Sequence, residues 1–356
     1  MTKGPVLVTG GAGFIGSHVV DRLVERHYDV VVLDDLSGGF VENVNPGARF
    51  IQGSVLDVGL VSDMFRREPF KYVYHLAAYA AEGLSHFIKR FNYMNNLIGS
   101  VNLINAAVNA GGVECFVFTS SIAVYGKGQV PMAEDMTPRP EDPYGIAKYA
   151  VEQDLRESFE MFGLPYVTFR PHNVYGERQN IGDTYRNVIG IFMNQAMRGE
   201  PFTIFGDGTQ TRAFSHIDDV AAVIAAAPER RDSYNQVFNV GADVPYSVNT
   251  LAAAVAAAMN VELRVRYLEA RSEVLHAYSA HGRVRAVFGD LISDVSLAEG
   301  ILRMSKWAIS AGARVPKPFS DIEVARNMPP SWARLTLERQ AHASGAQSGD
   351  PFDSKG

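Results

Sequence analysis

A tyrosine and a lysine stand four residues apart in residues 143–148, Pro-Tyr-Gly-Ile-Ala-Lys. This spacing puts Tyr144 and Lys148 on one face of a helix that Pro143 can begin. A phenol has an ordinary pKa of about 10, so it acts as a base near neutral pH only where a nearby cation stabilises the phenolate. The pair therefore predicts a proton-transfer site, although the same spacing is also common on exposed helices without a catalytic role.

Hydroxyl side chains end the strand that we predict at residues 116–120. In a doubly wound sheet the carboxyl end of a strand faces the cofactor crevice, which is where Ser121 would lie. Ser121 can hydrogen-bond the same substrate hydroxyl that Tyr144 deprotonates, so Ser121, Tyr144 and Lys148 are the predicted catalytic residues. The hydroxyl of Ser120 should point to the opposite side and satisfy backbone groups at the strand end.

A glycine-rich turn at residues 10–16 follows an apolar strand and precedes an amphipathic helix. Glycines 11, 13 and 16 satisfy the G-x-G-x-x-G spacing, and Gly10, Gly13 and Gly16 add a three-residue repeat. Such glycines permit a tight turn, admit a pyrophosphate to the backbone amides and let the helix pack close to the sheet. We therefore predict a dinucleotide site rather than a turn without function.

Asp34 lies 18 residues beyond the last glycine, at the end of the second predicted strand. A carboxylate in this place binds the ribose hydroxyl pair and repels a 2′-phosphate, which favours NAD over NADP as the cofactor. In the alternative interpretation, Asp34 or Asp35 only begins the turn at residues 36–39. The two interpretations are compatible.

The order of the predicted elements indicates an α/β fold with a doubly wound parallel (Rossmann) sheet. Short β-branched apolar runs at 6–8, 30–33, 50–52, 72–76, 116–120 and 166–170 alternate with helix-period segments at 17–26, 60–67, 91–110 and 144–162. This alternation predicts helices on both faces of the sheet and a dinucleotide-binding domain over residues 1–175.

A smaller α+β lobe is predicted over residues 176–335, with some crossing of the chain between lobes. Helices are expected near 187–197 and 251–259, and short strands near 202–205 and 237–240. We expect this lobe to pack over the carboxyl edge of the sheet. Residues 341–356 should be disordered, because Ser, Gly, Asp and Lys dominate that stretch.

Composition excludes several other function classes. The 356 residues carry a formal charge of −6 and no long basic run, so we expect no nucleic-acid partner. The single Cys115 can form no internal disulfide, and no metal-ligand spacing appears, so we expect no metal and a cytoplasmic location. A strand pattern begins within five residues and no apolar run reaches 18 residues, so we expect neither a signal peptide nor a membrane span.

Five segments together resemble the extended short-chain dehydrogenase/reductases that act on nucleotide sugars, with motifs closest to those of UDP-glucose 4-epimerases. These segments are residues 9–16, 75–78, 121–126, 144–148 and 170–176, and the resemblance covers nearly all of residues 4–290. Departures include Ser54, where relatives usually carry an aspartate, and Ala80, where some epimerases place a lysine beside the cofactor.

The resemblance implies two sets of binding residues. The NAD set is Gly10, Gly13, Phe14, Ile15, Gly16, Asp34, Asp35, Leu36, Ser37, Gly38, Ser54, Val55, Leu76, Ala77, Ala78, Asn95, Thr119, Tyr144, Lys148 and Pro171. The UDP-sugar set is Ser121, Tyr144, Asn173, Asn187, Val188, Thr203, Phe205, Arg212, Phe214, Arg271 and Glu273. Phe205 suits a uracil ring, and forked arginine side chains such as Arg212 and Arg271 suit a diphosphate.

The residues after Ser121 favour epimerisation at C4 of a UDP-sugar through a transient 4-keto sugar. By the resemblance, dehydratases carry Asp-Glu at this place and UDP-glucuronate decarboxylases a glutamate, whereas Ile122 and Ala123 cannot transfer a proton. Alternatives are a UDP-N-acetylglucosamine or UDP-glucuronate 4-epimerase, a nucleotide-sugar dehydratase or decarboxylase, and, from another class, a non-catalytic NAD(H)-binding protein.

Two positions bear on the sugar, and two helices bear on assembly. Asn180 stands where relatives acting on UDP-glucuronate carry an arginine, and Ala277 stands where epimerases restricted to glucose and galactose often carry a tyrosine. We therefore predict UDP-glucose and UDP-galactose as the main pair, UDP-N-acetyl sugars as additional substrates and UDP-glucuronate as a poor one. The family also packs the helices near 91–110 and 144–162 against a second copy, which predicts a homodimer.

Overall fold

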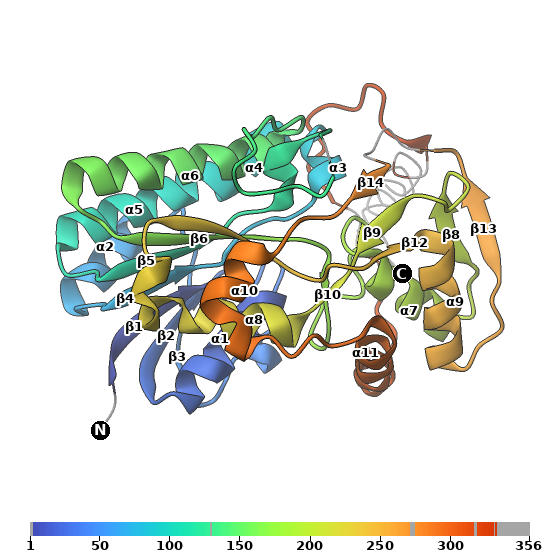
Figure 1. Ribbon diagram of the computed structural model, residues 1–356, viewed down its shortest axis with the longest axis horizontal. Helices are drawn as coiled ribbons and strands as arrows, with labels where there is room; N and C mark the ends of the chain where they lie inside the picture. The colour runs from blue at the N-terminus through green and yellow to red at the C-terminus, as the bar shows by residue number, and fades with distance from the viewer. Residues whose placement is uncertain (1–2, 129, 271–274, 317–318, 331, 333–356) are drawn as a thin grey trace, which may run out of the picture.

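The computed structural model describes residues 3–128, 130–270, 275–316, 319–330 and 332. Its centre is a seven-stranded sheet in the order β11-β6-β5-β4-β1-β2-β3, and every neighbouring pair of strands runs parallel (Figure 1). The strands are β1 (Lys3–Thr9), β2 (Tyr28–Asp34), β3 (Arg49–Gln52), β4 (Tyr72–His75), β5 (Cys115–Thr119), β6 (Tyr166–Pro171) and β11 (Gln236–Val240). The predicted doubly wound α/β class is confirmed.

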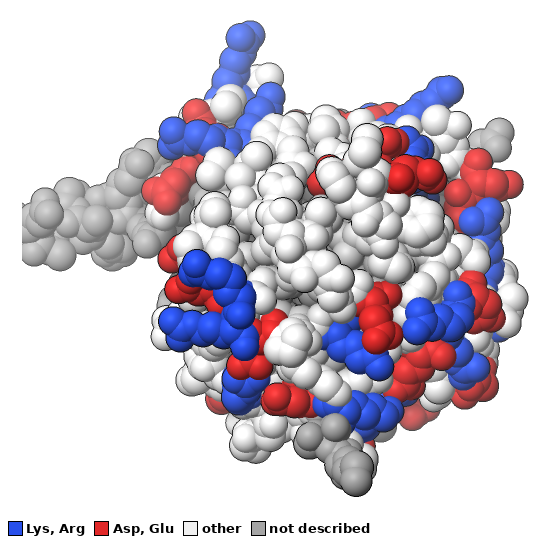
Figure 2. Space-filling view, turned by 90° about the vertical axis from the view of Figure 1, so that its left-hand side faces the viewer, with Lys and Arg blue, Asp and Glu red and all other residues white. Residues whose placement is uncertain are grey.

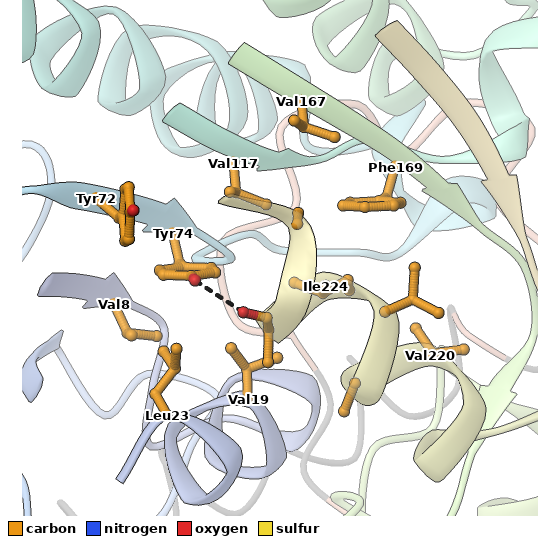
Figure 3. Packing of buried hydrophobic residues seen from close by; sticks show 14 of the residues in the cluster. Val8, Val19, Leu23, Tyr72, Tyr74, Val117, Val167, Phe169, Val220 and Ile224 are labelled. Atoms are coloured by element: carbon orange, nitrogen blue, oxygen red, sulfur yellow. Dashed lines mark hydrogen bonds between the residues drawn. The ribbon is translucent and has the colours of Figure 1, made fainter. Parts of the chain in front are cut away.

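Three helices cover one face of the sheet: α1 (Phe14–Glu25), α8 (Ile217–Ala226) and α10 (Gly282–Phe288). Figure 3 shows Val19 and Leu23 of α1 and Ile224 of α8 packed against strand side chains, in a cluster without exposed members. The hydroxyl of buried Tyr74 donates to the Ala225 carbonyl at 2.9 Å (Figure 3). This bond satisfies a polar group that burial would otherwise leave unpaired.

The opposite face is covered by α2 (Val58–Arg67), α5 (Gly99–Ala110) and α6 (Pro143–Phe162). The predicted helix at 91–110 is divided into α4 (Lys89–Tyr93), a π-helical segment at Met94–Ile98 and α5. Helix α6 begins sharply, because Asp142 accepts a hydrogen bond from the Gly145 N–H at 2.8 Å and Pro143 needs no backbone partner.

The second lobe combines α7 (Val188–Met197), α9 (Val248–Met259) and α11 (Leu297–Ala311) around its own apolar core. Small sheets join β8 (Phe202–Phe205) to β13 (Val265–Leu268), and β9 (Thr211–Ala213) to β12 (Pro245–Ser247) and β14 (His276–Ala277). A parallel pair, β7 (Val174–Tyr175) and β10 (Ser215–His216), lies where the chain passes between the lobes. A short helix, α3 (Glu82–Ser85), follows β4.

The chain returns to the first lobe after residue 175 more extensively than we predicted. We expected residues 237–240 in the second lobe, but β11 pairs with β6 as the edge strand of the main sheet. Helices α8 and α10 also belong to the first lobe, since they bury Val220 and Phe288 against that sheet. The physical reason is that Phe238 and Val240 are fully buried, which requires a neighbouring strand and a helical layer.

Two features bear on possible partners: the distribution of charge on the surface, and the length and hydrophobicity of the helices. On the face shown in Figure 2, acidic and basic side chains alternate around a broad uncharged area, without a continuous basic stripe. None of the helices in the described ranges is long and apolar enough to cross a membrane. Residues 341–356, which we predicted to be disordered, lie outside the described residues.

Candidate active site

A cleft of about 1660 Å³ runs between the carboxyl ends of the central strands and the second lobe. Of the predicted site residues that the structure describes, all but Leu36 line this cleft. Leu36 lies beside it in the left-handed region at φ 61°. Arg271 and Glu273 fall outside the described residues. The structure thus brings both predicted binding sets to one continuous space.

The glycine turn leaves no room for side chains. Gly10 has φ 75°, and a Cβ built there would lie 2.7 Å from the Ala77 nitrogen. A Cβ on Gly16 would overlap the carbonyl oxygen of Gly10. Helix α1 begins after Gly13 without a side-chain cap, so its first amides point into the cleft. This cradle of open backbone donors fits a dinucleotide pyrophosphate.

The Asp34 carboxylate stabilises the glycine turn through hydrogen bonds to backbone N–H groups. This carboxylate accepts hydrogen bonds from the Ala12 N–H at 3.0 Å and the Leu36 N–H at 2.8 Å. Burial raises the pKa of Asp34, while these backbone bonds act to lower it. The carboxylate therefore organises the turn, and its position on the cleft wall also suits a ribose hydroxyl pair.

A buried histidine joins the glycine turn to the loop after β4. Thr9 Oγ1 lies 2.8 Å from His75 Nδ1, and His75 Nε2 lies 2.8 Å from Ser100 Oγ. Burial, with a smaller contribution from Lys148, lowers the pKa of His75 to about 3, so the ring is neutral. Thr9 Oγ1 also accepts the Ala77 N–H, which fixes the loop of the cleft wall.

Tyr144 lies in the first turn of α6 and is 7% exposed. Burial raises the pKa of its phenol, whereas a hydrogen bond with the Ser121 side chain acts to lower it. Ser121 also accepts the Ala123 N–H at 3.1 Å, so its hydroxyl is held at the end of β5. The two hydroxyls that sequence spacing suggested are therefore neighbours in the cleft.

Lys148 lies one turn further along α6 and is 2% exposed. Its Nζ donates to the Thr119 carbonyl at 2.8 Å and lies 5.8 Å from the centroid of the Tyr144 ring. Burial lowers the pKa of Lys148 to about 7, although the Glu152 carboxylate acts to raise it. An amine with this pKa can gain or lose a proton near neutral pH.

A buried polar network that we did not predict lies beneath these residues. Glu152 accepts hydrogen bonds from the Ser120 hydroxyl at 2.5 Å and from Arg170 Nε at 2.9 Å. Arg170 also donates to the Tyr125 hydroxyl at 2.7 Å. The hydroxyl of Ser120 thus serves a carboxylate rather than backbone groups. Glu152 sits four residues beyond Lys148, a spacing from which this partner could have been found.

Three residues that we predicted to bind the UDP-sugar are held by hydrogen bonds, two of which join distant segments. Asn173 has φ 41°, and its Nδ2 donates to the Ala213 carbonyl at 3.1 Å. Asn187 caps α7 by accepting the Ile189 N–H at 3.1 Å. Arg212 Nη1 donates to the Thr211 and Leu275 carbonyls at 2.9 and 3.0 Å. These bonds orient side chains that the sequence could only place by resemblance.

His172 is buried and fully hydrogen-bonded. Its Nδ1 lies 3.1 Å from the Ala213 carbonyl oxygen, and its Nε2 lies 3.1 Å from His281 Nε2. Burial lowers the pKa of His172 to about 3, so its ring is neutral. This position supports a structural role for His172 rather than that of a proton shuttle.

Several cleft residues were missed by sequence reasoning. They are Tyr79, Tyr185 and Arg186 from the lobes, and Met328 and Trp332 from a C-terminal segment, which we define as residues 319–330 with Trp332. The C-terminal segment lies beyond residue 290, where the resemblance ends. Within the described residues, no group of three or more His, Cys, Asp or Glu side chains is placed to hold a metal ion.

Comparison with known proteins agrees with this site. The sequence model of the NAD dependent epimerase/dehydratase family matches residues 6–241. The UDP-glucose 4-epimerase of Mycolicibacterium smegmatis is 35% identical over 308 residues, which cover 83% of this chain and 96% of that protein. A structure of UDP-glucose 4-epimerase from Thermotoga maritima with UDP-glucose superposes with a TM-score of 0.82 at 35% identity, covering 86% of this chain and 99% of that one.

A further solved relative contains both a nucleotide sugar and NAD. It is the UDP-glucuronic acid 4-epimerase from Bacillus cereus in complex with UDP-glucuronic acid and NAD, with a TM-score of 0.78 at 27% identity and coverage of 85% and 98%. The chain therefore belongs to the NAD-dependent epimerase/dehydratase family. The predicted family resemblance and the NAD cofactor are confirmed.

Proposed function

We propose that this protein epimerises C4 of a UDP-sugar, with UDP-glucose and UDP-galactose as the main pair. The observation that carries the proposal is the convergence of Ser121, Tyr144 and Lys148 on the same cleft as the glycine turn. Similar proteins named UDP-glucose 4-epimerase support the choice of substrate class.

Tyr144 is the proposed base. As a phenolate it takes the proton of the C4 hydroxyl, and it returns that proton after the sugar has turned its other face, so no proton is gained or lost overall. Ser121 hydrogen-bonds the same hydroxyl, and the charged form of Lys148 stabilises the phenolate. When bound, NAD supplies the acceptor and donor for the C4 hydride. The cofactor is therefore unchanged after each turnover.

The segment after Ser121 supports simple epimerisation rather than dehydration or decarboxylation. Ile122 and Ala123 begin a short 3₁₀ turn directly at the catalytic hydroxyl, and both line the cleft. Neither side chain can donate or accept a proton, so elimination of water would have no added acid and base at this place.

Two cleft positions support the proposed sugar preference. Asn180 carries no charge, and its Oδ1 accepts the Gly182 N–H at 3.2 Å. A uronate would therefore lack a charge-assisted bond at this residue. Ala277 lies buried on β14 and lines the cleft, where its small side chain leaves space for an N-acetyl group.

The direct test compares kcat/KM for UDP-glucose, UDP-N-acetylglucosamine and UDP-glucuronate on one preparation whose bound cofactor has been identified by mass spectrometry. UDP-glucose should be the best substrate. A tenfold preference for UDP-glucuronate, about 1.4 kcal/mol in transition-state binding, would contradict the argument from Asn180. Release of CO₂, a 4-keto-6-deoxy product, or no turnover despite bound NAD would each point to one of the alternative functions.

We also propose a cytoplasmic homodimer. Met94, Ile98 and Ile146 are 41%, 41% and 42% exposed on the two helical segments predicted to pair with a second copy. Burial of these side chains against their counterparts would remove apolar surface from water. The one cysteine, Cys115, is buried and unpaired, as suits a reducing compartment. Light scattering at micromolar concentration should give twice the chain mass, and Ile98→Glu should shift it toward the monomer.

A further inference from the structure

Arg186 reaches from the second lobe into the cofactor side of the cleft. Its Nε lies 2.6 Å from Asp183 Oδ2, and its guanidinium carbon lies 4.7 Å from the centroid of the Tyr79 ring. The side chain is 25% exposed, whereas that of Asp183 is 8% exposed. One edge and one flat face of the guanidinium are therefore held by the protein, which orients the rest of the fork.

The terminal nitrogens of Arg186 face open space. Among the described residues, none accepts a hydrogen bond from Nη1 or Nη2. A Cβ built on Gly38 would lie 3.5 Å from Nη2, so this nitrogen is beside the loop that follows β2. Two forked donors on the wall of a cleft, for which the described part of the chain offers no acceptor, indicate an anionic ligand.

The loop beside Arg186 lies directly on the glycine turn. The Phe40 N–H donates to the Ala12 carbonyl at 3.0 Å, and a Cβ on Gly39 would lie 2.5 Å from the same oxygen. The fork of Arg186 and the open amides after Gly13 therefore line neighbouring walls of one space. A pyrophosphate bound to those amides would meet the guanidinium from the other side.

The lysine side chains on the first-lobe wall of the cleft already have protein partners. Lys148 donates to the Thr119 carbonyl, and its pKa is lowered to about 7 by burial. Lys127 lies 3.4 Å from a Glu141 oxygen. The guanidinium of Arg186 can provide a positive charge to this space.

The C-terminal segment immobilises the residues on either side of Arg186. The Phe319 ring lies 5.4 Å from the Tyr79 ring, and the Phe319 N–H donates to the Tyr185 hydroxyl at 3.2 Å. The Trp332 ring lies 5.2 Å from that of Tyr185. Because Tyr79 and Tyr185 are packed in this way, the Arg186 guanidinium loses little further conformational freedom when it binds a ligand.

The segment is itself anchored on the first lobe. The Glu323 carboxylate accepts the Arg90 and Phe91 N–H groups at 2.7 and 2.8 Å, which satisfies two open donors at the start of α4. Support for Arg186 therefore comes from both lobes.

We propose that Arg186 binds the pyrophosphate of NAD and closes the dinucleotide site from the second lobe. The assignment rests on the family's cofactor and not on the identity of the sugar. A substrate carboxylate is the competing anion, but the position of Nη2 beside Gly38 favours the dinucleotide.

The test measures cofactor retention, which needs no turnover. Wild type, Arg186→Gln, Arg186→Lys and Arg198→Gln are purified in parallel, and the exchange of bound NAD for isotopically labelled NAD is followed by mass spectrometry. Arg198 is a matched control, because it is also paired with a nearby carboxylate, Glu200, at 2.8 Å but lies outside the cleft lining. Arg186→Gln should release NAD at least tenfold faster, and Arg198→Gln should behave as wild type.

Exchange by Arg186→Gln within twofold of wild type would overturn the proposal. Unchanged exchange with a selective loss of UDP-glucuronate binding over UDP-glucose binding would also overturn it and assign the arginine to a substrate carboxylate. If circular dichroism shows that Arg186→Gln is unfolded, Arg186→Lys provides the test. NAD exchange at least threefold faster in Arg186→Lys than in wild type supports the forked contact, and unchanged exchange contradicts it. If Arg186→Gln exchanges NAD faster but the wild type turns over no UDP-sugar, the assignment of Arg186 to the pyrophosphate is supported. The proposed sugar chemistry is then contradicted.

Discussion

The glycine turn and the polar network beneath Tyr144 are built in opposite ways. The turn uses backbone from one short segment, and its geometry depends on side chains that are absent, as at Gly10 and Gly16. The network uses full side chains from α6, β6 and the segment that follows β5, joined by bonds between residues up to 45 positions apart. One region is local and the other exists only when several elements have assembled.

This difference separates the kinds of damage that each region should show. Loss of a contact at the turn should release cofactor from a protein that stays folded. Loss of a contact in the network should leave a buried charge unpaired, which costs stability of the whole sheet. The four substitutions below test this contrast.

Glu152→Gln should cause the largest loss. The substitution leaves Arg170, whose side chain is 4% exposed, without its carboxylate, so the free energy of unfolding should fall by about 3–5 kcal/mol. Urea denaturation measures the change. Glu157→Gln on the same helix is the control, since its ion pair with Arg156 is exposed and water screens the attraction between the two charges. Equal effects in the two variants would show that the network is not what stabilises this part of the sheet.

Tyr144→Phe should separate chemistry from folding and binding. Removal of the proposed base should lower turnover by about 10²-fold or more, while NAD stays near one per protomer. Steady-state kinetics and mass spectrometry of released cofactor give the two readouts. Tyr149→Phe, on the same helix but outside the cleft lining, is the control. Unchanged turnover would remove Tyr144 from the mechanism.

Asp34→Ala should act on the glycine turn and on the cofactor that binds there. The loss of the proposed ribose contact should weaken NAD binding by about tenfold, because one hydrogen bond to a charged acceptor contributes on the order of 1.5 kcal/mol. Discrimination against NADP should also decrease. Asp63→Ala on the outer side of α2 is the control. Recovery of mainly NADP from the wild type would refute the role given to Asp34.

Lys148→Met should stabilise the protein while it abolishes activity. Burial lowers the pKa of Lys148 from 10.5 to about 7, so below pH 7 the folded state contains a charged amine removed from water. Wild-type stability should therefore rise between pH 7 and 10.5, where only the folded form has lost the proton.

The gain from Lys148→Met should consequently be largest below pH 7, about 2 °C or more in Tm, and should shrink toward pH 10. Differential scanning calorimetry at pH 6, 8 and 9.5 measures this trend, with the surface variant Lys127→Met as the control. A gain independent of pH would mean that the folded and unfolded forms bind the same number of protons at this amine, so that burial does not lower its pKa.

Local patterns in the sequence were sufficient for most of the first-lobe elements that precede residue 175. Strand and helix periods predicted β1 to β6 and the long helices between them, but not α3 or the division of the segment at 91–110. The spacing of Tyr144 and Lys148 and that of Gly10 to Gly16 indicated one site, because each motif lies within a single strand, turn or helix. Side chains at such spacing have nearly the same geometry in any protein. The predicted and observed bounds of these elements differ by only a few residues at their ends.

Tertiary structure decided everything that depends on the path of the chain between lobes. Three contacts illustrate this: β11 pairs with β6 in the main sheet, Arg170 bonds to Glu152, and Arg186 lies beside Gly38. They join residues 18 to 148 positions apart, and no local periodicity encodes them. The C-terminal segment shows this most clearly. Phe319 and Trp332 carry no motif, and they contact the cleft residues Tyr79 and Tyr185 only because the chain folds back onto them. Spacing along one element determines which side chains share a face, whereas contacts between elements are set by how all the apolar faces are buried together.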